Sequence, residues 1–288
     1  MKNVEIVYRY GSGDAVIPPR PVDASEARRR LDDGNRAFAA LLDNVGEEGP
    51  AARRVVEVDP RDLGLLSAGG APAQRPYAAV LGCADARVPV ELVFSEGPND
   101  LFVVRVAGNG LGGDALGSLK YAVDNLGDCL KLVVVLGHSG CGAVTSAVDI
   151  FLDPAEYLSI ASKYTMRGLL DRLLVVVHSV ARRMAAQWGP GVTQRAGYRD
   201  ALVEASVVTN AALAAHTVQQ ELCRDARGIR AVYGVYLIGT HDVWAPRGGS
   251  AGVAGLADAP DDRDAFHGLG DAVMRSERIA ALLDRARD

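Results

Sequence analysis

Apolar runs that each end in a glycine constrain the fold of this chain more than any other feature. They cover residues 77–82, 101–108 and 130–137, and a fourth run follows at 231–239. Short continuous apolar runs are typical of strands that are buried on both faces, as in parallel sheets. Between the second and third runs, residues 112–127 have the length of a crossover helix, and a strand–helix–strand order predicts a right-handed parallel unit. We therefore expect an α/β fold with a central, mainly parallel sheet of about four strands flanked by helices.

The helices are predicted from apolar spacing and from length. An early helix is expected over 23–43, which forms an N-terminal helical arm, and a long helix over 199–222. Residues 150–198 contain a valine run that favours a strand, but the length of "LLDRLLVVVHSVARRM" favours a helix. The Gly- and Ala-rich stretch 245–264 is typical of a linker, and an amphipathic helix is expected over 271–288.

These elements divide the chain into three parts. Residues 1–76 form the N-terminal arm and a connection, and residues 77–245 form the α/β core, with a helical insertion near 150–198. Residues 246–288 form the linker and the C-terminal helix.

Composition excludes several classes of protein. The 288 residues carry 31 Lys and Arg against 36 Asp and Glu, a net charge of −5 without the clustered basic face of a nucleic-acid-binding protein. We find no apolar run of the length that a membrane helix needs and no apolar segment of a signal peptide, so we expect a cytoplasmic protein without a membrane partner. Four cysteines are too few for a disulfide scaffold in a chain of this length.

Residues with metal-binding chemistry follow two of the predicted strands. Cys83, Asp85 and Arg87 alternate directly after the first strand, and alternate residues of an extended chain point the same way. His138 and Cys141 follow the third strand. Because parallel strands present their carboxyl ends at one edge of the sheet, we expect two thiolates and one imidazole to converge there. Two cysteines and one histidine with an open fourth position are a known catalytic zinc arrangement.

The surroundings of Cys141 fit this interpretation. Cys141 precedes a predicted helix start, where the helix dipole lowers the pKa of a thiol and favours the thiolate. Gly140 and Gly142 let the backbone approach the metal closely. The remaining cysteines, Cys129 and Cys223, are interpreted as small buried hydrophobes.

The other histidines and a glycine-rich segment give weaker evidence of function. His178 and His216 lie in apolar helical stretches and are interpreted as core or interface histidines, and His241 and His267 have no supporting context. The glycines of "AGNGLGGD" have neither the spacing nor the Lys-Ser/Thr of a nucleotide-binding loop.

Together these residues resemble the β-class carbonic anhydrases. The resemblance rests on "GCADARVPVELVF", "DLFVVRVAGN", "GSLKYAV" and "VLGHSGCGAV", and more loosely on "GNRAF" and "GVYLIGTHDV". It covers most of residues 25–245 and is densest over 77–148. It implies one Zn²⁺ per chain on Cys83, His138 and Cys141, with an Asp85–Arg87 dyad beside the open position. It also implies a homodimer or larger assembly in which the early helix packs across onto the partner.

The implied reaction is the reversible hydration of carbon dioxide to bicarbonate and a proton. Zinc lowers the pKa of a bound water to about 7 in favourable sites and so supplies hydroxide near neutrality. Asp85 would accept a hydrogen bond from the zinc-bound hydroxide and orient it, while Arg87 holds Asp85 ionised. Released from Arg87, Asp85 could become a fourth metal ligand and block the site, so it is a candidate ligand as well as a candidate catalytic residue.

Several positions depart from the family pattern. Ala86 replaces a frequent Ser, and Glu96 stands where many relatives carry Gln. A regulatory bicarbonate pocket of some relatives uses a Trp, an Arg and a Tyr. Arg105 and Tyr236 are the matching candidates here, but Val80 takes the Trp position, and we expect the pocket to be incomplete.

Two alternative functions stay open at this point. A carbonyl sulfide or carbon disulfide hydrolase would use the same fold and ligands. A non-catalytic zinc-stabilised binding protein would need a closed set of four ligands, which the Asp85–Arg87 pair argues against.

Overall fold

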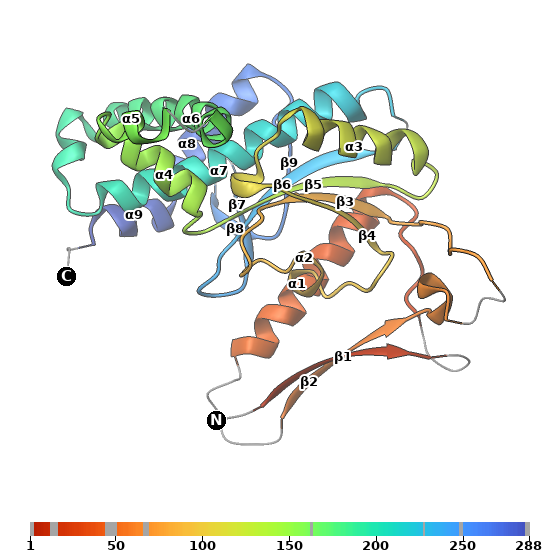
Figure 1. The fold of residues 1–288 in the computed structure, drawn as a ribbon. Coiled ribbons are helices and arrows are strands. Elements are labelled where there is room, and N and C mark those ends of the chain that lie inside the picture. Colours follow the sequence, from red (N-terminus) through yellow and green to blue (C-terminus); the bar gives the residue numbers. More distant parts are fainter. Residues whose placement is uncertain are drawn as a thin grey trace.

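A central sheet organises the molecule, and Figure 1 shows helices on both of its faces. The structure is a computed structural model that describes residues 3–11, 17–43, 51–65, 69–161, 164–226, 228–247 and 250–285. The strand order in the described part of the chain is β4-β3-β5-β6-β7-β8, and β9 also pairs with β6. The parallel strands are β3 (Ala78–Gly82), β4 (Leu101–Arg105), β5 (Leu132–His138) and β6 (Arg230–Tyr236). All four were predicted from apolar runs, and the α/β class is confirmed.

The stretch after β6 corrects a prediction. It was expected to be a linker, but β7 (Val243–Arg247), β8 (Ser250–Ala254) and β9 (Ala257–Asp258) extend the sheet in antiparallel fashion. Small residues made this segment look irregular, yet ladder hydrogen bonds are made by the backbone and need no side chain. Val243 and Leu256 supply the buried apolar contacts, at 1% and 0% exposure.

Alternating side chains of β3 serve the two faces. Ala79 and Leu81 join the larger core, and Ala78 and Val80 join the smaller one. The larger core lies under α3 (Gly113–Asn125), α4 (Gly142–Leu152), α6 (Tyr164–Trp188) and α7 (Tyr198–Val218). The helices α1 (Ala24–Asp43) and α2 (Val90–Val93) cover the smaller core.

The predicted early and crossover helices are confirmed as α1 and α3. Residues Ala27, Leu31 and Phe38 of α1 are buried in the smaller core of its own chain. The expected packing of this helix across onto a partner stays a prediction.

The insertion near 150–198 is helical, as its length predicted. The segments α5 (Glu156–Ala161) and α6 precede a short 3₁₀ turn, Pro190–Gln194. The valine run lies within α6, where Val176, Val177 and Val180 face the larger core.

The helix α7 and the turn of π-helix that follows it (Gln219–Cys223) form a segment long and apolar enough to cross a membrane. About two thirds of that window, 67%, is buried inside the fold, which identifies it as the central core helix.

Both ends of the chain differ from the prediction. Near the N-terminus, β1 (Val4–Tyr10) and β2 (Ala52–Val58) form a separate parallel pair, followed by a 3₁₀ turn at Pro60–Leu63. The helix α1 separates these two strands in the sequence, so no local pattern predicts their pairing.

The predicted C-terminal helix is two helices, α8 (Arg263–Arg275) and α9 (Glu277–Leu283). Ser276 divides them because its backbone is extended and its hydroxyl accepts from the Ile279 amide. Residues 286–288 of that prediction lie outside the described residues.

Candidate metal centre

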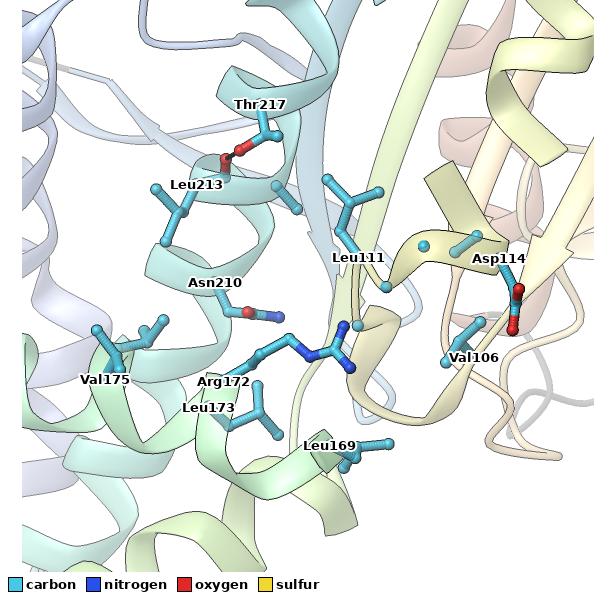
Figure 2. A pocket seen from close by; sticks show the side chains of 16 residues that line it. Val106, Leu111, Asp114, Leu169, Arg172, Leu173, Val175, Asn210, Leu213 and Thr217 are labelled. Carbon is cyan, nitrogen blue, oxygen red and sulfur yellow. Dashed lines mark hydrogen bonds between the residues drawn. The ribbon is translucent and has the colours of Figure 1, made fainter. Parts of the chain in front are cut away.

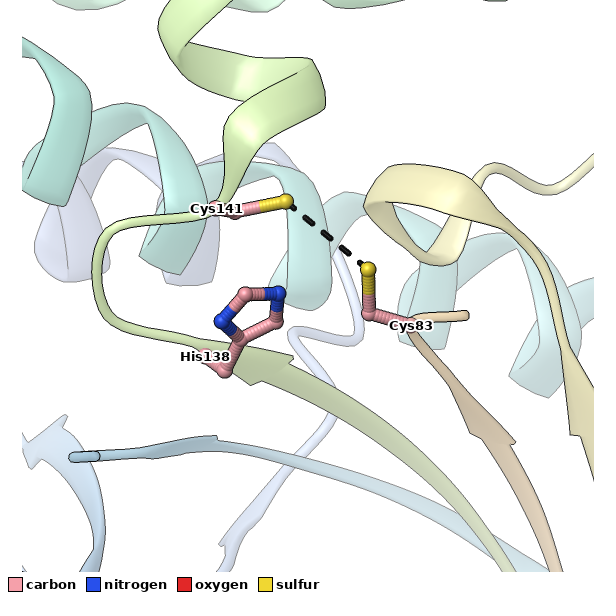
Figure 3. A group of neighbouring side chains, drawn as sticks. All are labelled: Cys83, His138 and Cys141. Atoms are coloured by element: carbon pink, nitrogen blue, oxygen red, sulfur yellow. Dashed lines mark hydrogen bonds between the residues drawn. The ribbon is translucent and has the colours of Figure 1, made fainter. Parts of the chain in front are cut away.

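Two neighbouring strands and one helix bring the predicted ligands together. Cys83 directly follows β3, and His138 is the last residue of β5, which pairs with β3 in parallel. Cys141 stands at the N-terminus of α4, three residues further along the chain. Figure 3 shows the three side chains facing one another at the carboxyl edge of the sheet.

The ligand atoms of this trio are close and almost fully buried. Their sulfur and ring nitrogen atoms all lie within 4.8 Å of one another, and the two Sγ atoms are 3.9 Å apart. Cys83, His138 and Cys141 are 4%, 0% and 1% exposed. His138 Nε2 is buried and has no hydrogen-bond partner among the described residues. A buried nitrogen without a partner, next to two sulfur atoms, fits a cation that all three atoms bind.

The orientation of His138 is fixed by a backbone carbonyl. Its Nδ1 lies 3.0 Å from the oxygen of Ser139, and because that oxygen can only accept, Nδ1 carries the proton. The lone pair of the neutral ring is therefore on Nε2, the atom that faces the thiols. Metal-bound histidines typically have such a partner on the other ring nitrogen.

The sulfur of Cys83 is placed to be a thiolate. The pKa of Cys83 is lowered to about 3, first because Cys141 donates a hydrogen bond to it, then through His138 and the amides of Asp85 and Gly108. Those amide nitrogens lie 3.4 and 3.3 Å from Sγ. The pKa of Cys141 is raised for the reciprocal reason, since its proton lies beside the Cys83 thiolate. The surroundings of the trio therefore favour a thiolate at Cys83.

Asp85 and Arg87 form a two-pronged pair beside the trio. Arg87 Nε and Nη2 lie 3.0 and 2.7 Å from the two carboxylate oxygens of Asp85, and the Arg87 amide lies 2.9 Å from Oδ1. These hydrogen bonds hold the pKa of Asp85 well below its usual range. Asp85 Oδ2 lies 3.8 Å from His138 Nε2, so the carboxylate borders the point that the ligand atoms share.

Arg105 has a structural partner that the sequence did not predict. Its Nε and Nη2 donate to the carbonyl oxygens of Cys83 and Asp85, at 3.0 and 2.5 Å. Tyr236 lies on β6, which β3 and β5 separate from Arg105 on β4, and its hydroxyl is 2.9 Å from His241 Nδ1. Arg105 therefore braces the segment that carries Cys83, and the two candidate pocket residues do not meet.

The loop between His138 and Cys141 is also held by residues that sequence reasoning missed. The amide of Gly140 donates to Glu204 of α7, at 2.8 Å. The Ser139 amide donates to Tyr236 O, and the Ser139 hydroxyl accepts from the Ile238 amide, both at 2.9 Å. An acidic residue within the apolar stretch that follows Asp200 was the available signal for Glu204.

The remaining cysteines and histidines lie apart from the trio. Cys223 is buried in the larger core, where burial raises its pKa to about 12, and Cys129 donates to Leu126 O. His216 is half-buried with its Nδ1 at 2.6 Å from Pro260 O, whereas His178 is exposed and contacts Phe151 edge-on.

A cavity of about 570 Å³ lies between α3, α6 and α7 (Figure 2). Its walls include the glycine-rich start of α3 and residues of α6 and α7. Its polar side chains are Asp114, Arg172, Asn210 and Thr217. Asn210 donates to the carbonyl of Gly108, whose amide contacts Cys83. Helix α6, in the stretch 150–198, thus forms one wall of this cavity, and another lining residue, Asn210, is linked through Gly108 to Cys83.

Fold and site together define an α/β protein with a buried Cys₂His metal-binding trio. A family model described as carbonic anhydrase matches residues 78–242, more than half of the chain. The chain therefore belongs to the carbonic anhydrase family, and the resemblance to its β class is confirmed.

Individual relatives match over shorter segments. Carbonic anhydrase 2 of Mycobacterium tuberculosis H37Rv is 48% identical over 86 residues, which cover 30% of this chain and 41% of that protein. The carbonic anhydrase of Mycolicibacterium smegmatis is 49% identical over 105 residues, which cover 35% and 50%. The chain thus spans about half the length, or less, of these curated relatives.

Solved structures are similar at lower identity. A tetrameric β-carbonic anhydrase of Sordaria macrospora has a TM-score of 0.47 and 20% identity, over 63% of this chain and 84% of that one. The Coccomyxa β-carbonic anhydrase has a TM-score of 0.42 and 24% identity, over 64% and 76%.

Proposed function

We propose that this protein is a zinc-dependent carbonic anhydrase that converts carbon dioxide and water to bicarbonate and a proton, reversibly. The observation that carries the proposal is the buried trio, with its unpartnered His138 Nε2 and the Asp85 carboxylate 3.8 Å from that nitrogen. Family membership supports the same reaction class.

The residues fit Zn²⁺ in kind and number. Cys83, His138 and Cys141 would hold it, which leaves a fourth position on the side of Asp85. Zinc bound there would acidify a water molecule and so supply hydroxide near neutral pH. Because two thiolates neutralise the charge of the metal, we expect this acidification to be weaker than with three histidines, and activity to rise into mildly alkaline pH.

Asp85 and Arg87 are proposed to orient the reacting oxygen. Asp85 is acceptor-only when ionised, so it selects an oxygen that presents a proton to it and turns the lone pair of that oxygen toward carbon dioxide. Arg87 keeps Asp85 ionised and fixes both carboxylate oxygens through its two-pronged bond. We propose this paired state for mildly alkaline pH, with Asp85 as a metal ligand only in a closed state at low pH.

The deciding experiment is stopped-flow measurement of carbon dioxide hydration by zinc-replete protein, with zinc content measured on the same sample. We expect one zinc per chain and a rate far above that of buffer. A zinc-replete protein that is inactive on carbon dioxide but hydrolyses carbonyl sulfide or carbon disulfide would replace the proposed substrate. A zinc-replete protein inactive on all three would favour the non-catalytic alternative.

A homodimer or larger assembly, a cytoplasmic location and the division of the chain at residues 76 and 245 stay predictions. Light scattering at micromolar concentration tests the assembly, and a monomer would contradict it.

A further inference from the structure

We propose that Glu204 is a positioning residue for His138, that it acts through the peptide group between Ser139 and Gly140, and that the C-terminal helix α9 holds it in place through Arg278. The inference rests on the proposed metal at Cys83, His138 and Cys141. It adds residues of α7 and α9 to that site, although neither contacts the ligand atoms.

The connection runs through a single peptide unit. Glu204 Oε1 accepts a hydrogen bond from the Gly140 amide at 2.8 Å. The carbonyl of the same peptide unit, Ser139 O, accepts from His138 Nδ1 at 3.0 Å. A carboxylate, a peptide and an imidazole are therefore joined in one line that ends at Nε2, the nitrogen that faces the two thiols.

A negative charge on the Glu204 carboxylate affects the His138 imidazole at the other end of these linked hydrogen bonds. A carboxylate on the amide makes the carbonyl of the same peptide a stronger acceptor, because consecutive hydrogen bonds polarise one another. A stronger acceptor on Nδ1–H orients the ring more firmly and makes Nε2 a better electron-pair donor. Glu204 is 8% exposed, so water screens this effect little.

Packing alone does not hold the loop. A cavity of about 420 Å³ lies between the loop and α9, and Ser139, Gly140 and Glu204 line it. A side chain added at Gly140 would meet nothing within 4 Å, so the glycine serves its left-handed φ of 61° and not close packing. On this side of the loop, hydrogen bonds do the positioning, and Glu204 makes the one on Gly140.

The helix α9 supplies the second partner of Glu204. Arg278 Nη2 donates to Glu204 Oε2 at 3.0 Å. Docking of α9 on α7 is close, since a Cβ at Gly197 would lie 1.8 Å from Leu282 O, and Ile279 and Leu283 are 0% and 2% exposed. Two other arginines that line the cavity are paired elsewhere, Arg87 with Asp85 and Arg199 with Asp149. Arg278 is thus the guanidinium that fixes the orientation of the Glu204 carboxylate.

Zinc affinity, measured by competition with a chelator on the full-length protein, tests the proposal without reference to turnover. Glu204→Ala removes the carboxylate, and we expect zinc affinity to fall about 10- to 100-fold, the range for losing an outer partner of a ligand. Glu204→Gln keeps an acceptor oxygen for Gly140 but not the charge, so its loss should be smaller. Arg278→Met should also weaken zinc binding, by less than Glu204→Ala.

Asp149→Asn is the matched control. It removes a carboxylate that forms a two-pronged bond with Arg199 of the same helix α7, at 2.7 and 2.8 Å, and it does not contact the loop. We expect unchanged zinc affinity. The absorption spectrum of the cobalt-substituted protein adds a second readout, because ligand-field bands report the geometry of the ligands. The bands should shift in Glu204→Ala and Glu204→Gln but not in Asp149→Asn.

The outcomes separate this inference from the proposed function. If the wild-type protein binds no zinc, the proposed function fails. If it binds zinc and both Glu204 variants bind it equally well with unaltered cobalt bands, Glu204 does not position His138. Glu204→Gln alone decides if Glu204→Ala does not fold. Wild-type zinc affinity in Arg278→Met would remove α9 from the proposal.

Discussion

Two carboxylate–arginine pairs of this protein have the same hydrogen-bond geometry and opposite electrostatic consequences. Arg87 grips Asp85 through Nε and Nη2, and Arg30 grips Glu96 through the same two nitrogens, with Nε–oxygen distances of 3.0 Å in both pairs. Yet the pKa of Asp85 is lowered, whereas that of Glu96 is raised to about 7.

Solvent accounts for the difference. The Asp85 and Arg87 side chains are 18% and 58% exposed, so the carboxylate keeps part of its hydration and gains the arginine in addition. Glu96 is 2% exposed, and burial costs its charged form more than Arg30 returns. Asp100 adds to the shift, because its carboxylate lies 3.2 Å from the same Arg30 nitrogen.

The comparison shows why the two pairs suit different work. A carboxylate held ionised at the border of a metal-binding trio is available to orient a reactant. A carboxylate that is buried between an arginine and a second acid ties α1 to the segment after α2, and its charge is a burden on stability. A carboxylate paired with an arginine therefore suits the proposed catalysis at one place and architecture at the other.

The largest effect is expected from removing a proposed metal ligand. The Asp85–Arg87 pair then has no metal beside it to act with, while both carboxylate–arginine pairs stay intact. In Cys141→Ala we expect zinc and activity to be lost together, measured by metal analysis and carbon dioxide hydration. Cys223→Ala is the control, because Cys223 packs in the core away from the trio. Full zinc occupancy in Cys141→Ala would refute the ligand assignment.

Neutralising Asp85, in the partly exposed Asp85–Arg87 pair, should lower turnover and leave the zinc content unchanged. Asp85→Asn keeps the shape of the side chain but can no longer act as a charged acceptor, so turnover should fall about 100-fold or more while zinc is retained. Glu96→Gln is the matched change in the buried pair and should retain both. Undiminished turnover in Asp85→Asn would show that both pairs are structural.

Neutralising Glu96, in the buried Arg30–Glu96 pair, should change how the free energy of unfolding depends on pH. Because the pKa of Glu96 is about 7 in the folded protein against an ordinary value of 4.5, the folded state binds more protons between these pH values. The contribution of Glu96 to the free energy of unfolding therefore falls as the pH rises through that window, by at most about 3 kcal/mol. Denaturant unfolding at several pH values should show wild type losing stability relative to Glu96→Gln over this range. A constant difference would contradict the raised pKa.

The two pairs also differ in whether the sequence could predict them. Cys83, His138 and Cys141 could be placed together because each stands at the end of a buried apolar run, and parallel strands end at one edge. The Asp85–Arg87 pair is local, two residues apart, so alternation along the chain predicted it. Arg30 and Glu96 are 66 residues apart, on α1 and after α2, and no local pattern joins them.

The same reason explains the elements that were missed. The strands β1 and β2 pair across α1, and β8 and β9 consist largely of small residues whose pairing is set by the edge of β6. Arg105 and Glu204 bond to backbone atoms, and a sequence does not display which backbone groups a fold leaves free. What was predicted depends on local periodicity, and what was missed depends on contacts that only the tertiary structure creates.

The smallest effect is expected from added bicarbonate, which in some relatives favours the closed state with the aspartate on zinc. A ligand shifts that balance only by its differential affinity for the two states. Here the pocket that would provide the difference is incomplete. Val80 is 0% exposed within the smaller core and offers no indole, and Arg105 is bound to the carbonyls of Cys83 and Asp85.

We therefore expect Asp85 to stay paired with Arg87 when bicarbonate is added. Initial rates of hydration, measured against bicarbonate at constant pH and ionic strength, should show no more than simple product inhibition, with sodium chloride as the control salt. A steep, cooperative loss of activity, together with a structure in which Asp85 binds zinc, would show that the exposed pair opens despite Val80. In that case the Asp85–Arg87 pair would be a switch, and its partial exposure would be what allows bicarbonate to act on it.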